Sequence, residues 1–145
     1  MKYISIVITC ILLLFSCRNN NYETIYNQEI LKISDCKNIK LANWILLNET
    51  GLEIDQKIQI VTTDYNGGIP LQIENLPIYY KAQINENQYK EYKERLLTGK
   101  YSDSWRFYEE NEHLDFVRFN KFELACRLKK DTILFGFRNV EGIAP

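Results

Sequence analysis

The stretch that decides the fold is Phe122–Arg138, which reads FELACRLKKDTILFGFR. Apolar residues recur at every second position on both sides of Lys130-Asp131, which is typical of two half-buried strands joined by a tight turn. With the turn there, residues whose numbers sum to 261 face each other. This register pairs core-type residues on one face: Leu128 with Ile133, Cys126 with Phe135 and Leu124 with Phe137. On the other face it places Glu123 opposite Arg138, so register and pattern agree.

Three more segments upstream of this hairpin have the same strand pattern. Trp105–Glu109 and Leu114–Phe119 are separated by polar turns and extend the hairpin into a predicted meander. Leu76–Ile84 alternates apolar residues at every second position, which predicts another half-buried strand.

A helix is predicted directly after that strand, over Glu86–Thr98. Asn85 is its expected N-cap, and Gln88 three residues later completes a capping box. Its apolar face is predicted to consist of Tyr89, Tyr92 and Leu96, and Gly99 is the expected left-handed stop.

The N-terminal half has weaker patterns. Apolar residues at helical spacing predict an amphipathic helix over residues 22–34. The apolar run 39–47 is interpreted as a strand. A hairpin is predicted from 57–63 to 69–73 around the turn residues 64–68.

These elements predict an α+β fold over residues 22–145. The chain of 145 residues is long enough for one domain, and its 46% apolar residues suit a folded chain. We expect a mostly antiparallel sheet with the helix Glu86–Thr98 packed on one face and an N-terminal helix beside it. The alternative is a β-sandwich or barrel with appended helices.

The N-terminus reads MKYISIVITCILLLFSC (Met1–Cys17): one positive charge, an apolar run, a small residue and a cysteine. The run of 13 residues from Tyr3 to Phe15 is typical of an export signal and is shorter than the roughly 17 to 25 residues of a transmembrane helix. Leu14-Phe15-Ser16-Cys17 resembles the lipobox of bacterial lipoproteins, with Phe15 where a small or medium residue is usual. The resemblance implies a signal peptide over residues 1–16 and a lipid on the Cys17 thiol.

Residues 17–21 are then the lipidated cysteine and a short polar tether. In bacterial lipoproteins an acidic residue directly after the cysteine often marks retention in the inner membrane, and none follows Cys17. The resemblance therefore implies a protein of the cell envelope anchored in the outer membrane. The alternative is an ordinary secretory signal cleaved nearby, although an Ala-x-Ala-like site is missing.

Two cysteines, Cys36 and Cys126, remain in the mature domain. An even number in an exported chain predicts a disulfide between them. The alternative is two buried free thiols, because cysteine also behaves as a small apolar residue.

Composition argues against most enzyme and nucleic-acid functions. A net charge of -1 gives no basic excess for phosphate contacts, so we expect no nucleic-acid partner. The sequence has one His, His113, and no glycine-rich phosphate loop, nucleophile elbow or Cys-x-x-Cys pair, so we expect no metal, no cofactor and no catalytic residue. The stretch around His113 is interpreted as a charged surface loop. The expected interface residues are Tyr65, Tyr79, Glu109, Glu110, Glu112, His113 and Asp115.

Small size, near-neutral charge and the predicted anchor favour a non-enzymatic protein-binding module at the membrane, acting as an inhibitor, adaptor or assembly accessory. Its expected partners are the membrane, through the lipid, and a protein. Two alternatives remain open: an immunity-type lipoprotein that neutralises an exported toxin, and a lipid-anchored hydrolase that uses His113 with Asp115 or Glu112.

Overall fold

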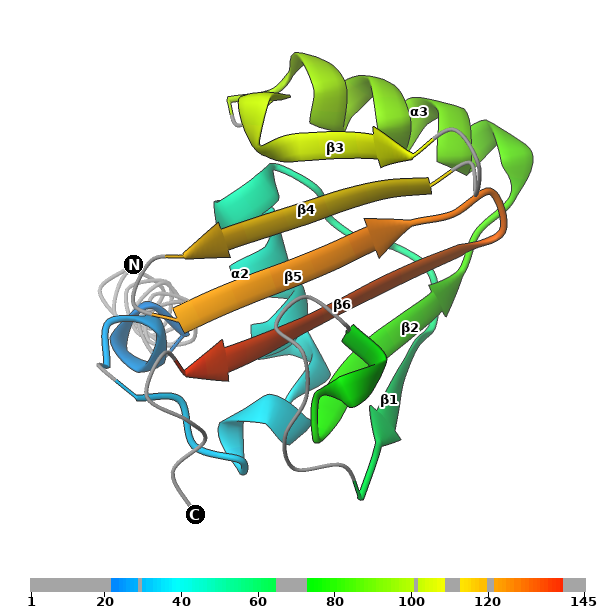
Figure 1. The fold of residues 1–145 in the computed structure, drawn as a ribbon. Coiled ribbons are helices and arrows are strands. Elements are labelled where there is room, and N and C mark those ends of the chain that lie inside the picture. The colour runs from blue at the N-terminus through cyan, green and yellow to red at the C-terminus, as the bar shows by residue number, and fades with distance from the viewer. Residues whose placement is uncertain are drawn as a thin grey trace, which may run out of the picture.

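The computed structural model describes residues 22–28, 30–64, 73–100, 102–108, 113–119 and 122–139. Six strands form one sheet in the order β1-β2-β6-β5-β4-β3, with every neighbouring pair antiparallel (Figure 1). The strands are β1 (Ile58–Thr62), β2 (Ile78–Gln83), β3 (Trp105–Tyr108), β4 (His113–Phe119), β5 (Phe122–Leu128) and β6 (Thr132–Asn139). Among the described residues β1 and β3 are not paired with each other, so the sheet is open. The predicted α+β class is confirmed, and the sandwich or barrel alternative is wrong.

The helices are α2 (Ile39–Thr50) and α3 (Glu86–Thr98), and residues 22–26 are also helical. Three short 3-10 turns complete the fold: η1 (Asp35–Lys37), η2 (Ile73–Asn75) and η3 (Ser102–Ser104). In Figure 1, α2 lies behind the sheet, α3 runs along its upper end beyond β3, and η2 lies in front. We call the α2 side the inner face of the sheet and the η2 side the outer face.

The C-terminal meander is confirmed, strand by strand. The β5–β6 pairing has the predicted register, with Cys126 opposite Phe135 and Glu123 opposite Arg138. Leu124, Cys126, Leu128, Ile133, Phe135 and Phe137 are all buried, at 5% exposure or less. The alternating pattern of Phe122–Arg138 therefore fixed both the strands and their inward faces.

The predicted strand over residues 39–47 is wrong, because this segment lies inside α2. The side chain of Asn38 accepts hydrogen bonds from the backbone N–H groups of Lys40 and Leu41, and so caps the helix. Gly51 ends it with a φ of 76°, a left-handed conformation that costs glycine little. The buried residues recur at helical spacing: Leu41, Ala42, Ile45, Leu46 and Glu49. An Asn cap and a Gly stop thus decide between helix and strand here.

The predicted hairpin between 57–63 and 69–73 is described only in its first strand. The first strand exists as β1, but its partner is β2, with Ile60 opposite Tyr80. Thr63 continues this contact, since its N–H donates to the carbonyl of Pro77. Residues 65–72, which include most of the expected turn and second strand, lie outside the described residues.

Helix α3 has the predicted start and apolar face but not the predicted end. Both reciprocal hydrogen bonds of the Asn85–Gln88 capping box are present, and Tyr89, Tyr92 and Leu96 are buried. Gly99 is not left-handed: its φ is -76° and its ψ is 179°. The chain turns directly into η3, where the N–H of Ser102 donates to the carbonyl of Gly99. An extended backbone serves this turn, so no left-handed residue is needed.

The predicted helix over residues 22–34 is shorter than expected. Helical residues end at 26, and turns that lead into η1 follow. The short helix packs against α2: the ring of Tyr26 meets Trp44 edge-on at 5.5 Å, and Tyr22 lies 6.4 Å from the same ring. The hydroxyl of Tyr26 donates to the buried carboxylate of Glu49. Aromatic contacts and this hydrogen bond tie the start of the described chain to α2.

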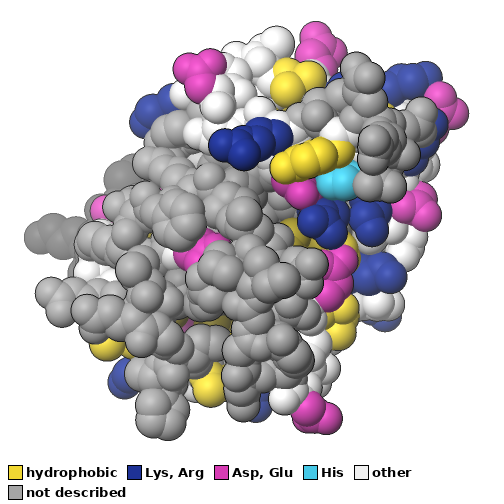
Figure 2. All heavy atoms as spheres, viewed as in Figure 1, with side chains coloured by type: hydrophobic (Ala, Val, Ile, Leu, Met, Phe, Trp, Pro, Cys, Tyr) yellow, Lys and Arg dark blue, Asp and Glu magenta, His cyan; other side chains and the backbone are white. Residues whose placement is uncertain are grey.

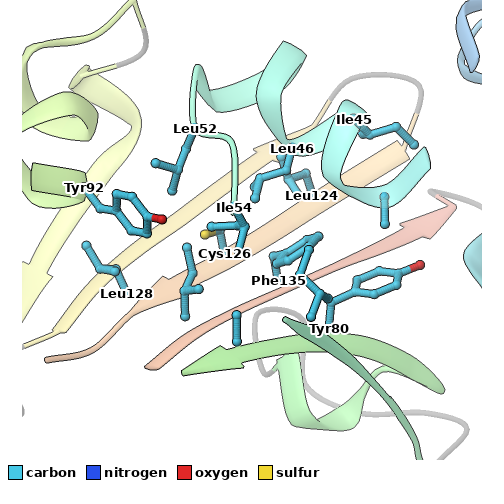
Figure 3. Close-up of a cluster of buried hydrophobic side chains, with 14 of the residues drawn as sticks. Ile45, Leu46, Leu52, Ile54, Tyr80, Tyr92, Leu124, Cys126, Leu128 and Phe135 are labelled. Atoms are coloured by element: carbon cyan, nitrogen blue, oxygen red, sulfur yellow. The ribbon is translucent and has the colours of Figure 1, made fainter. Parts of the chain in front are cut away.

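The main core lies on the inner face of the sheet. It joins residues from the sheet with residues from α2, α3 and the loop after α2, including Leu52 and Ile54 (Figure 3). Tyr80 stacks on Phe135 at a ring distance of 4.8 Å, and both are about fully buried. This cluster supplies most of the apolar burial that drives folding.

A second, smaller cluster lies on the outer face. Ile73 and Leu76, from η2 and the residues after it, cover Ala125 and Leu134 of the sheet. Gly136 permits this cover to lie close, because a Cβ at that position would be 2.4 Å from Leu76 Cδ1. Apolar side chains therefore cover the outer face near η2, and polar side chains lie on this face toward β3 and β4.

Among the described helices, none has the length and apolar character needed to span a bilayer.

Candidate functional site

His113 begins β4 and lies on the outer face of the sheet. It is 8% exposed, so the expectation of a surface loop at this residue is wrong. Its Nε2 lies 3.3 Å from Asp115 Oδ2, two residues along the same face. Its Nδ1 is buried and has no hydrogen-bond partner within the described part of the chain. The alternation of the strand brings His113 and Asp115 together, as their spacing in sequence requires.

Asp115 is held by an arginine from the next strand. The register of β4 and β5 places Asp115 opposite Arg127, whose Nε and Nη2 donate to the two carboxylate oxygens at 2.7 and 3.0 Å. This hydrogen bonding raises the pKa of Arg127 above its usual value. Glu74 of η2 adds a longer contact, 3.6 Å from Arg127 Nη1. This bidentate pair of hydrogen bonds holds both side chains in one orientation.

Tyr108 covers the histidine. It ends β3 directly opposite His113, and the two rings are stacked at 5.0 Å with an angle of 19°. Tyr108 is 44% exposed, the largest exposure among the exposed large apolar side chains of the described chain. We call Tyr108, His113, Asp115, Arg127 and Glu74 the His113 cluster. In Figure 2 the histidine (cyan) lies among hydrophobic, acidic and basic side chains on the outer face.

The structure separates the predicted interface residues into three groups. His113 and Asp115 are in contact, as described above. Tyr79, another expected interface residue, is half-buried and packs against the small outer cluster, because the segment around η2 covers that part of the face. The others lie outside the described residues: Tyr65, Glu109, Glu110 and Glu112, together with the expected lipidation residue Cys17.

Cys36 and Cys126 are free cysteines in the structure, so the predicted disulfide between them is wrong. Cys126, Phe135 and Tyr80 lie side by side on three neighbouring strands, which puts Cys126 about 10 Å from Tyr80 across the sheet. The hydroxyl of Tyr80 donates to the carbonyl of Cys36 and points away from Cys126 (Figure 3). Two stacked rings therefore stand between the cysteines, while a disulfide needs Cα atoms within about 7 Å.

Both thiols are protonated at neutral pH. Burial, with a smaller effect of Asp35, raises the pKa of Cys36 to about 11, and burial raises the pKa of Cys126 further. Cys36 also borders a small apolar hollow with Leu31, Leu41 and Phe137, which is too narrow to admit a water molecule. Neither thiol has the lowered pKa of a reactive cysteine.

Both ring nitrogens of His113 are confined in the His113 cluster. The ring of His113 has one nitrogen against Asp115 and the other buried, and its side chain is 10% exposed. No group of three or more His, Cys, Asp or Glu side chains that could hold a metal is present among the described residues. The exposed Tyr108 and the fixed Arg127 are of the residue types enriched in protein interfaces.

No protein-family model matches this chain, nor does any curated protein or solved structure.

Sequence reasoning missed Tyr108, Arg127 and Glu74 as members of the cluster. For the contact of Asp115 with Arg127 the signal is one residue out of register: a two-residue turn at Asn120-Lys121 would pair residues whose numbers sum to 241, whereas Asp115 and Arg127 sum to 242. The contact of Glu74 had none, because η2 reaches the cluster only through the tertiary fold.

Proposed function

We propose that this protein is a lipid-anchored, non-enzymatic protein-binding module of the bacterial cell envelope, and that the His113 cluster is the centre of its binding surface. The observation that carries the proposal is the state of Tyr108, which is exposed and yet held by stacking on His113. An aromatic side chain that is already fixed loses little conformational entropy when a partner covers it.

The charges around Tyr108 support a protein partner. Arg127 is fixed by Asp115 through two hydrogen bonds, and a fixed arginine can still offer its remaining N–H groups to a partner. Rim charges of both signs steer a partner and fix its orientation more than they add affinity. Aromatic and arginine side chains supply most of the energy at such interfaces.

The position of the cluster fits an anchored binder. Tyr108 ends β3 and His113 begins β4, at the right-hand end of the sheet in Figure 1. The helix 22–26, which in this proposal follows the lipidated Cys17 and its tether, lies at the opposite end of the strands (Figure 1). Helix α2, behind the sheet, and helix α3, beyond β3, would serve as scaffold, and the cluster would face away from the membrane.

The contact between His113 and Asp115 favours a second candidate, a lipid-anchored hydrolase. A general base needs a nitrogen within hydrogen-bond reach of the substrate. In His113 the Nδ1 atom is buried, and Asp115 occupies the side of Nε2. This arrangement supports the binding module over the hydrolase.

The deciding experiment is affinity capture of the full protein from its native membrane, with mass spectrometry of the co-purifying proteins and of the processed N-terminus. We expect an acylated Cys17 and one stoichiometric partner. Tyr108→Ala should reduce recovery of that partner by at least about tenfold, as for a central aromatic residue.

Leu97→Ser is the matched control, because Leu97 is 41% exposed on α3, outside the cluster. This variant should recover the partner as the wild type does. An unmodified Cys17 would remove the anchor from the proposal. Equal loss of partner in both variants, or no partner at all, would remove the binding surface; a hydrolytic activity abolished by His113→Gln would establish the second candidate.

A further inference from the structure

The segment from Ile30 to Lys40 has two exposed apolar residues, Ile30 at 42% and Ile33 at 37%. Three lysines lie in the same short segment, Lys32, Lys37 and Lys40, and all three are exposed. Exposed isoleucines interleaved with lysines give this segment the apolar and basic side chains that an interfacial membrane contact uses. We call these five residues the basal patch.

Local hydrogen bonds give the basal patch a fixed shape. The N–H of Lys32 donates to the carboxylate of Asp35 at 3.1 Å, and the N–H groups of Asp35 and Cys36 donate back to the carbonyl of Lys32. The side chain of Asn38 then caps α2. Asp35 is the single acidic residue between Ile30 and Lys40, so the segment has a net charge of about +2. The patch thus presents apolar and basic side chains from an ordered turn.

The place of the patch in the chain indicates what covers it. Only the four residues 18–21 separate Tyr22 from Cys17, and the five extended steps from Cys17 to Tyr22 reach at most about 17 Å. The helix 22–26 is fixed on α2 by Tyr22 and Tyr26, so it does not lengthen this reach. A lipid on Cys17 would therefore hold the end of the domain that includes the patch at the bilayer surface.

We propose that the basal patch docks on an anionic bilayer surface, with Ile30 and Ile33 in the headgroup region and the three lysines against lipid phosphates. The inference rests on the proposed lipid anchor. Each lysine at an anionic surface strengthens association by about fivefold, and apolar side chains beside it enter the interface. Docking would orient the His113 cluster outward, since the cluster lies at the other end of the strands (Figure 1).

The test is hydrogen exchange of the purified full protein in phosphatidylcholine vesicles with and without phosphatidylglycerol. Amides of residues 30–40 should exchange about tenfold more slowly in the anionic vesicles, while amides of α3 should not change. Ile30→Ser with Ile33→Ser, and separately Lys32→Gln with Lys37→Gln, should each abolish the difference. Leu97→Ser with Lys57→Gln is the control pair at exposed positions outside the patch and should retain it.

Equal exchange of residues 30–40 in both kinds of vesicle would overturn the proposal, even with an acylated Cys17. If mass spectrometry finds Cys17 without lipid, the anchor fails instead, and flotation of the same protein with phosphatidylglycerol vesicles tests the patch alone. Flotation lost with the isoleucine variant would support the patch, and no flotation of the wild type would overturn it.

Discussion

The two faces of the sheet differ in what covers them. On the inner face, the side chains of β5 and β6 pack against helices in one large apolar cluster. On the outer face, the same two strands meet only the segment around η2, and beyond it the polar His113 cluster continues across β3, β4 and β5. The comparison teaches that one face supplies stability while the other is left for surface chemistry.

The sharpest way to break this comparison uses two neighbouring residues of β6 that face opposite ways. Phe135→Ala, on the inner face, should lower the free energy of unfolding by about 4 kcal/mol, because a fully buried aromatic ring is lost. Leu134→Ala, on the outer face, should cost about 2 kcal/mol, since its cluster is smaller. Urea unfolding measures both. A Leu134→Ala loss equal to that of Phe135→Ala would show that the outer face is as important a core as the inner one.

The polar part of the outer face is tested by Asp115→Asn. We expect a loss of about 2 kcal/mol, because Arg127 keeps one weaker hydrogen bond and loses its nearer counter-charge in a half-buried site, leaving Glu74 at 3.6 Å. The comparison is Glu86→Gln, which breaks the fully exposed pair with Lys90 and should leave the unfolding midpoint unchanged. Equal midpoints for both variants would mean that the cross-strand pair is no stronger than a surface pair.

The close cover of the outer face is tested by Gly136→Ala. The added methyl group would meet Leu76 Cδ1, so the leucine must move, at a cost of about 1 kcal/mol. Hydrogen exchange at residues 73–76 should become faster while exchange in α2 stays the same. Unchanged exchange around η2 would contradict the tight contact.

On the inner side, Cys36 should make stability depend on pH in the alkaline range. Its pKa is raised from 9.0 to about 11 in the folded protein, so the unfolded chain ionises first and gains stability. Stability should therefore be full below pH 9 and fall as the pH rises toward 11, and Cys36→Ala should make this fall less steep. The free energy of unfolding at several pH values measures it; an unchanged slope in the variant would refute the assignment to Cys36.

Alkylation in denaturant without a reducing agent, followed by mass spectrometry, is a direct check of the cysteines. Cys36 and Cys126 should both be alkylated, since the stacked rings of Tyr80 and Phe135 separate them. A pair of unmodified cysteines that becomes reactive only after reduction would restore the predicted disulfide.

The C-terminal strands were predictable because their information is local. In Phe122–Arg138 apolar residues recur at every second position on both sides of a short turn, and this turn leaves one register that buries them. The capping box of α3 was predictable for the same reason, since its partners lie three residues apart. In contrast, the apolar run of α2 fits either a strand or a helix, and burial against the sheet selects the helix.

By itself, the sequence determined the strands of the meander, the register of its hairpin and the helix Glu86–Thr98. Only the tertiary structure decided that β1 pairs with β2, that the two cysteines stay apart and that Tyr108, Arg127 and Glu74 join the histidine. The physical reason is the separation along the chain over which each kind of contact acts. Alternation, caps and tight turns act over a few residues, while strand order and the cover of a sheet face depend on contacts between segments far apart in the chain.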